Sequence, residues 1–107
     1  PFTCQWIGYV VYMDKNQPLN WATAFAVKEA RETMGLSQAQ LADFAGLSEK
    51  YISKAERGTI GVSIAALVQI ARVLKLEPAE LMRRIDAEMK RGPRRPEGKI
   101  GRPRKEA

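Results

Sequence analysis

Two short helical patterns meet at a glycine within residues 37–58, and this stretch constrains the fold more than any other. Ser37 is a good helix N-cap, and Gln40 lies three residues on, which is the spacing of a capping box. Gly46 can adopt the positive φ angle at which the first helix ends, and Ser48 can cap the next helix. The pattern therefore predicts a helix-turn-helix, in which two short helices cross at a tight turn.

The second of these helices, 49–57, has an inward and an outward face. On a helical wheel Ile52 and Ala55 point inward, and Ala42 of the first helix is small enough to allow a close crossing. The outward face is polar and carries Glu49, Lys50, Ser53, Lys54 and Arg57. A helix with such a face can enter the major groove of duplex DNA and place side chains against base edges.

In this stretch the chain resembles the Cro and lambda-repressor (XRE) type of helix-turn-helix DNA-binding domain. The resemblance covers about residues 27–82, which is half of the chain. It depends on motifs that occur in the family's order, namely Gln38, Ala42, Gly46, Ile52, Glu56-Arg57-Gly58, Leu67, Ile70, Ala71 and Leu74. It implies an all-α, five-helix lambda-repressor-like domain that binds double-stranded DNA.

The resemblance also implies roles for individual residues. Family members use the positions of Ser37, Gln38, Ser48 and Tyr51 on phosphates, and they pair an arginine at the position of Arg31 with a glutamate at that of Glu56. The chemistry of the outward face adds that Lys50 and Lys54 can donate to guanine and Glu49 can accept from cytosine, while Ser53 is compatible with any base. Taken singly, each polar residue could equally be a helix cap or a solvated side chain, so the interpretation depends on the whole set.

Three further helices are expected around this motif. The first spans 21–34 with Asn20 as its N-cap, and its apolar positions are Trp21, Phe25, Val27, Ala30 and Met34, all expected in the core. The others span about 63–74, capped by Ser63, and 78–90, with Pro78 in the first turn. Ile85 and Met89 extend the apolar stripe of the last helix, which favours a contact with a partner helix in a homodimer.

We expect three segments: an N-terminal extension (1–20), the helix-turn-helix domain (21–90) and a basic, disordered tail (91–107). The extension includes a β-prone run at 6–12. It is either a strand that pairs across a dimer or an addition upstream of a natural start at Met13. Pro1 cannot be an initiator, and both interpretations remain open.

The net charge of +6 lies entirely at the C-terminal end, since residues 83–107 contain ten basic and four acidic side chains. Beyond residue 91 only Ile100 is large and apolar, so this segment cannot bury enough surface to fold. Gly101-Arg102-Pro103, followed by Arg104, resembles the core of an AT-hook. Arg102 and Arg104 are therefore expected on DNA, either in the minor groove or as part of a purely electrostatic tail.

The composition argues against several other classes of protein. The chain has no histidine and one cysteine, so we expect no catalytic residues, no metal site, no cofactor and no internal disulfide. The longest apolar run has eight residues and is too short to span a membrane. The sequence thus predicts a cytoplasmic, non-enzymatic, sequence-specific regulator of transcription that acts as a dimeric repressor. The alternative is an antitoxin or a transcription-bridging module of the same fold, with a toxin or another protein as its partner.

Overall fold

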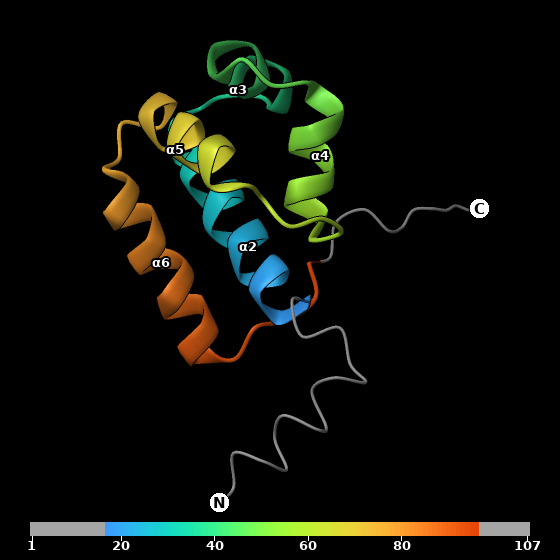
Figure 1. Cartoon of the computed structure of the whole chain (residues 1–107), viewed down its shortest axis with the longest axis vertical. Coiled ribbons are helices and arrows are strands. Elements are labelled where there is room, and N and C mark those ends of the chain that lie inside the picture. Colours follow the sequence, from blue (N-terminus) through green and yellow to red (C-terminus); the bar gives the residue numbers. More distant parts are fainter. Residues whose placement is uncertain (1–16, 97–107) are drawn as a thin grey trace, which may run out of the picture.

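The computed structural model describes residues 17–96, and these form five helices with no strand among them. The helices are α2 (Gln17–Thr33), α3 (Gln38–Ala45), α4 (Glu49–Arg57), α5 (Ile64–Val73) and α6 (Pro78–Arg91). The long helix α2 lies at the centre, α6 runs beside it in the opposite direction, and α3 and α4 form the helix-turn-helix (Figure 1). The all-α, five-helix fold expected from the sequence is confirmed for these residues.

The predicted caps of α3, α4 and α5 are present. The Ser37 hydroxyl accepts from the Gln40 backbone N–H at 3.0 Å, and the Gln40 side chain accepts from the Ser37 N–H at 2.9 Å, which completes the capping box. Ser48 and Ser63 cap α4 and α5 in the same way, accepting from the backbone three residues on. Because each cap is specified within four residues of sequence, these helix starts were predictable without knowledge of the fold.

The start of α2 was predicted wrongly. The helix begins at Gln17, so Asn20 lies inside it and is not its cap. Pro18 occupies the first turn of the helix. Backbone N–H groups in this turn have no carbonyl acceptor within the helix, so the N–H that proline lacks is not needed there. The expected division at residue 20 consequently falls within α2.

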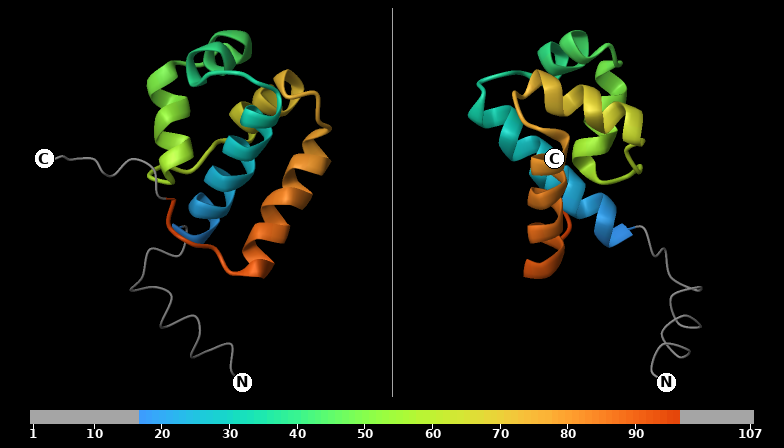
Figure 2. Two further views of the ribbon diagram at one scale, coloured as in Figure 1. Left: turned by 180° about the vertical axis from the view of Figure 1, so that it is seen from behind. Right: turned by 60° about the vertical axis from the view of Figure 1, so that its left-hand side comes forward.

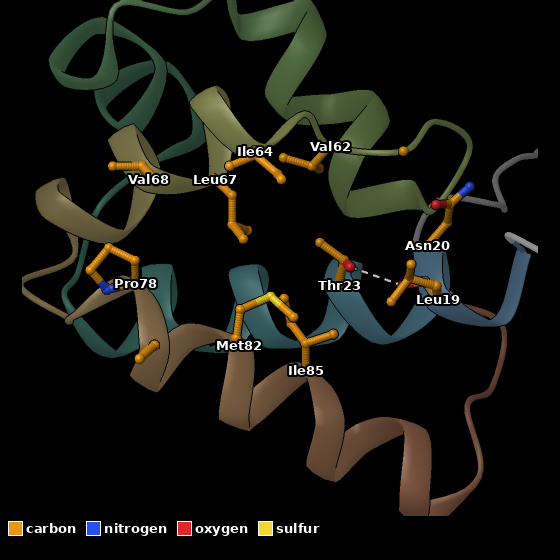
Figure 3. A pocket seen from close by; sticks show the side chains of 12 residues that line it. Leu19, Asn20, Thr23, Val62, Ile64, Leu67, Val68, Pro78, Met82 and Ile85 are labelled. Carbon is orange, nitrogen blue, oxygen red and sulfur yellow. Dashed lines mark hydrogen bonds between the residues drawn. The ribbon is translucent and has the colours of Figure 1, made fainter.

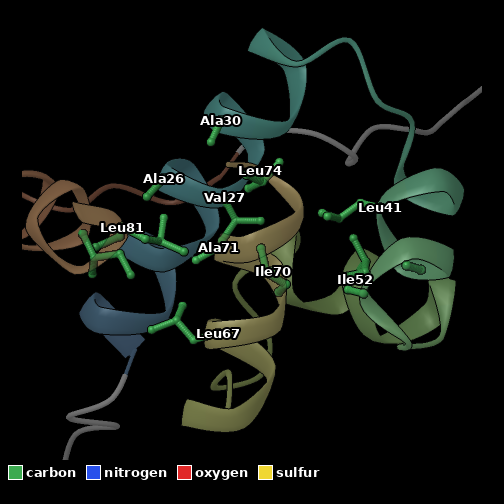
Figure 4. Close-up of a cluster of buried hydrophobic side chains, with 14 residues drawn as sticks. Ala26, Val27, Ala30, Leu41, Ile52, Leu67, Ile70, Ala71, Leu74 and Leu81 are labelled. Carbon is green, nitrogen blue, oxygen red and sulfur yellow. The ribbon is translucent and has the colours of Figure 1, made fainter. Parts of the chain in front are cut away.

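Side chains from all five helices meet in one core (Figure 4). Its largest fully buried members are Val27, Leu41, Ile52, Ile70, Leu81 and Ile85. Six alanines complete this core cluster, among them Ala42 of α3, which is 2% exposed. Ile52 is completely buried, and this fixes which face of α4 is turned outward.

Ile85 and Met89 pack within the chain, so the predicted contact of these residues with a partner helix is wrong. Ile85 is only 2% exposed, and Met89 is half-buried against the core. The reason is that α6 runs antiparallel beside α2 (Figure 1), so its apolar stripe meets the core cluster, to which α2 contributes Ala22, Ala26, Val27 and Ala30.

Three apolar residues of the first predicted helix lie outside the core. Met34 follows the end of α2 and is 40% exposed, because the chain turns away there through Gly35. Trp21 and Phe25 are half-buried and are not members of the core cluster. They face residues 92–96 instead.

Residues 92–96, here termed the return segment, leave the end of α6 and run back past the start of α2 toward the C-terminal end of α4 (Figures 1 and 2). The Arg94 guanidinium lies over the Phe25 ring, 4.4 Å from its centroid. Pro96 lies beside Gly58, the residue that ends α4. We expected disorder from residue 91 onward, whereas 92–96 are packed on the domain. The rest of the predicted tail, 97–107, lies outside the described residues.

Two glycines test this packing because they share one backbone conformation, with φ of +74° at both Gly46 and Gly58. A Cβ at Gly46 would meet no atom within 4 Å, whereas a Cβ at Gly58 would lie 2.6 Å from Trp21 and 3.3 Å from Pro96. Gly46→Ala should cost only the backbone strain, about 1–2 kcal/mol of unfolding free energy. Gly58→Ala should cost clearly more, measured by urea denaturation. Equal losses would show that neither Trp21 nor Pro96 is held against Gly58.

Candidate nucleic-acid interface

The outward face of α4 is the candidate interface. Ser48, Glu49, Lys50 and Lys54 are exposed, and Tyr51 and Ser53 are half-buried. The opposite face is buried through Ile52, Ala55 and Glu56. The rotation of α4 about its axis is thus fixed by the core, and the predicted base-reading residues lie on the side turned away from it.

The start of α3 adds the second part of the predicted interface. Ser37 is exposed and Gln38 is half-buried, and α3 packs directly on α4. The helix-turn-helix therefore brings all eight predicted site residues between Ser37 and Lys54 onto two adjoining helices. Arg102 and Arg104, the remaining two, lie outside the described residues.

Tyr51 is held by a second contact that the sequence did not predict. Its hydroxyl oxygen accepts a hydrogen bond from the Ser63 backbone N–H at 3.2 Å, across the loop that joins α4 to α5. A phenol oxygen that accepts in this way still has its own O–H to donate. The arrangement orients the tyrosine and leaves a donor suited to a phosphate oxygen.

A buried ion pair fixes the end of α4 to α2, as the resemblance implied. Arg31 Nε donates to Glu56 Oε2 at 2.7 Å and Arg31 Nη2 donates to Glu56 Oε1 at 2.9 Å, a bidentate geometry. The side chains are only 11% and 2% exposed. The hydrogen bond that Arg31 donates to Glu56 outweighs the effect of burial and raises the pKa of Arg31 above its ordinary value.

Two further hydrogen bonds extend this pair to the rest of the motif. Gln38 Nε2 donates to Glu56 Oε1 at 3.0 Å, and Arg31 Nη1 donates to the Leu36 carbonyl at 2.7 Å. Glu56 therefore joins α2, α3 and α4 at one point. Gln38, which was expected on DNA, also helps to position the two helices of the motif, and its amide nitrogen keeps a second hydrogen to donate.

Two surfaces outside the predicted site are notable. Arg57 and Arg95 line a cleft of about 560 Å³ at the C-terminal end of α4. An apolar groove of about 620 Å³ lies between α2, α5 and α6, with Leu19, Ile64 and Met82 exposed along it (Figure 3). Sequence periodicity could not predict either, because each is assembled from segments far apart in the chain.

Within residues 17–96 no group of three or more His, Cys, Asp or Glu side chains is placed to hold a metal ion. None of the helices in this part of the chain is long and apolar enough to span a membrane.

Known proteins share this arrangement. The model of a helix-turn-helix family matches residues 27–81, about half of the chain. A curated relative, the uncharacterized HTH-type transcriptional regulator y4dL of Sinorhizobium fredii, is 40% identical over 60 residues. That match covers 52% of this chain and 31% of the relative, so the chain spans about a third of the relative's length.

Solved structures match over the same domain. The clp gene regulator ClgR of Corynebacterium glutamicum is 26% identical with a TM-score of 0.64, covering 67% of this chain and 77% of that one. The restriction-modification controller protein C.AhdI of Aeromonas hydrophila is 35% identical with a TM-score of 0.56, covering 58% and 94%. Together with the capped helix pair and its buried Arg31–Glu56 link, these matches show that the chain belongs to the XRE-type helix-turn-helix family of DNA-binding transcriptional regulators.

Proposed function

We propose that the chain is a sequence-specific repressor that reads the major groove of its operator with α4. The observation that carries this proposal is the outward face of α4, where Lys50 and Lys54 are exposed opposite the buried Ile52 and Glu56. Selection of binding sites from random duplex DNA tests it. Repression follows from competition, since a domain seated in the major groove at a promoter blocks other proteins from the same base pairs.

Each polar residue of the motif takes a defined role in this proposal. Lys50 and Lys54 donate to guanine O6 and N7, and Glu49 accepts from cytosine N4. Ser53 lies between Lys50 and Lys54 in the sequence, and its hydroxyl can contact either a donor or an acceptor on a base edge. The contacts to phosphates, which set the register on the duplex, come from Ser37, Gln38, Ser48 and Tyr51. Gln38 and Tyr51 suit this role because each is already oriented by a hydrogen bond within the protein.

The proposal includes a homodimer, because residues 1–82 have no net charge and a single domain would neutralise few phosphates. The apolar groove supplies a surface for the second copy, since Leu19, Ile64 and Met82 are exposed there and Ile64 reaches 80% exposure. Contiguous exposed apolar side chains commonly mark a protein interface.

Met82→Glu should therefore convert the dimer to a monomer in sedimentation velocity experiments, because a carboxylate would have to be buried without a partner. Met34→Glu is the matched control, since Met34 is similarly exposed but lies outside the groove. A wild-type protein that sediments as a monomer, or a Met82 variant that stays dimeric, would contradict this surface.

We further propose that the tail binds flanking DNA through Arg102 and Arg104, in the minor groove or by charge alone. Deleting 97–107 removes four basic and two acidic side chains, so the dependence of the binding constant on salt should become shallower. Only the minor-groove version expects Arg102→Ala to abolish a preference for flanking A·T pairs. An unchanged salt dependence after the deletion would contradict both versions.

An antitoxin or bridging module is the second candidate function. The exposed apolar groove and the absence of net charge in residues 1–82 favour it, because both features suit a protein partner. It differs from the first candidate in one result: random-duplex selection would then enrich no sequence.

A further inference from the structure

The return segment brings a second set of arginines to the end of the recognition helix. Arg95 lines the same cleft as Arg57, although the two are 38 residues apart in sequence. Trp21 and Gly58 form part of the cleft, and Thr59 lines it from the α4–α5 loop. The cleft thus joins three segments: the start of α2, the end of α4 and the return segment.

Two contacts on either side of Arg95 fix its position. Arg94 lies over Phe25 at 4.4 Å, a cation–π contact, and Pro96 packs beside Gly58. Gly58 has no side chain, and this leaves the room that Trp21 and Pro96 occupy. The backbone of Arg95 is therefore held between two anchored neighbours.

The charge of the cleft has one sign. Arg57 and Arg95 are both exposed, and no acidic side chain among the described residues lines the cleft. Within residues 17–96 all the ion pairs involve other residues, so neither of these two guanidinium groups is neutralised by the folded domain. Exposed guanidinium groups in such a cleft are suited to bidentate contacts with phosphate oxygens.

The position of the cleft relative to the predicted base contacts indicates which phosphates it would meet. Arg57 follows Lys50 by seven residues, a rise of about 10 Å along the helix axis. The major groove is about 12 Å wide, and residues near the start of a recognition helix reach the bases. The C-terminal end of α4 therefore lies near the edge of the groove, where the sugar-phosphate backbone runs.

We infer that this cleft is a second DNA-binding site, in which Arg57 and Arg95 bind phosphates of the duplex beside the base pairs read by α4. The inference rests on the proposed function and extends it. It also assigns a role to the return segment, which places Arg95 beside the C-terminal end of the recognition helix.

Salt dependence of binding tests the cleft directly. The probes are a duplex enriched from random sequence by the wild-type protein and a duplex of scrambled sequence. Arg57→Ala with Arg95→Ala should reduce the slope of log K against log salt by about 0.9 for each phosphate that is no longer neutralised, or about 2 together. Binding to both probes should weaken by similar factors, because phosphate contacts carry no sequence information.

The matched control is Arg72→Ala with Arg83→Ala, which removes two exposed arginines from α5 and α6. A slope for the cleft variant equal to that of this control would overturn the inference. Failure of the proposed function would look different: the wild-type protein would enrich no sequence at all. All four substitutions are at exposed positions, so the fold should be retained, which thermal denaturation verifies.

Cleavage of the DNA by a chelate attached to the protein tests independently whether the cleft lies against the duplex. An iron chelate attached at Thr59→Cys, which is exposed and lines the same cleft, should cleave the enriched duplex at nucleotides flanking the base-contacted segment when Cys4 is replaced by serine. The same chelate at Asp86→Cys, on an exposed site of α6, should leave the duplex intact. Absence of cleavage from residue 59, with the duplex bound, would show that the cleft does not face DNA.

Discussion

Glu56→Ala is expected to lower the free energy of unfolding by about 3–5 kcal/mol, the cost typical of removing one partner of a buried ion pair. The loss arises because Arg31, 11% exposed, would keep its charge without the carboxylate that accepts two of its hydrogen bonds. Gln38 would lose its acceptor at the same time. Urea denaturation of the purified variant measures the change.

Glu49→Ala is the matched control, because it removes the same carboxylate from the exposed start of α4. It should change stability by no more than about 0.5 kcal/mol, as exposed substitutions generally do. Small and equal effects of the two substitutions would show that Glu56 is not a structural link between α2, α3 and α4.

The second large effect is expected on sequence recognition. Lys50→Ala and Lys54→Ala should each remove about 1–3 kcal/mol of discrimination at one base pair, since each lysine is proposed to donate to one base. Competition between the preferred duplex and single-base variants measures this loss position by position. The control Lys90→Ala removes the same charge from the last turn of α6 but should leave the preference at every base pair unchanged.

An unchanged base preference in both lysine variants would contradict the proposed docking of α4. A uniform weakening across all duplexes would contradict it in a different way. That result would place the lysines on phosphates, and the outward face of α4 would then position the domain without reading bases.

The helix-turn-helix was predictable from the sequence because its determinants are local. Ser37 with Gln40, Gly46 and Ser48 specify two helix starts and a turn within a dozen residues, and each occupies its expected position. The Arg31–Glu56 pair is not local, and only the family resemblance pointed to it.

The wrong predictions have a common cause: they concern packing between segments that are distant in the sequence. The early start of α2 was missed because Asn20 was interpreted as the N-cap, although it lies inside a helix whose first turn contains Pro18. Ile85 and Met89 need no partner helix, because both pack against the core of the same chain. The contact of Arg94 with Phe25 depends on where α6 ends and in which direction the chain returns, and a basic, proline-rich sequence gives no sign of either.

Two residues of the candidate site also have contacts that the sequence did not predict. Gln38 and Tyr51 were expected on phosphates, and each also has a partner within the domain. Their partners, Glu56 and the Ser63 backbone, lie 18 and 12 residues away. Polar residues at a helix start give no indication of such contacts until the helices are placed in space.

Base reading by α4 is best tested by selecting binding sites from random duplex DNA with two proteins in parallel, the wild type and the Lys50→Ala, Lys54→Ala double variant. We expect the wild-type protein to enrich two related half-sites whose centres lie about 10 base pairs, or a multiple of that spacing, apart. The double variant should lose the preference within each half-site while still binding DNA. Enrichment of the same sequence by both proteins, or of no sequence by the wild type, would contradict the claim that α4 reads the operator.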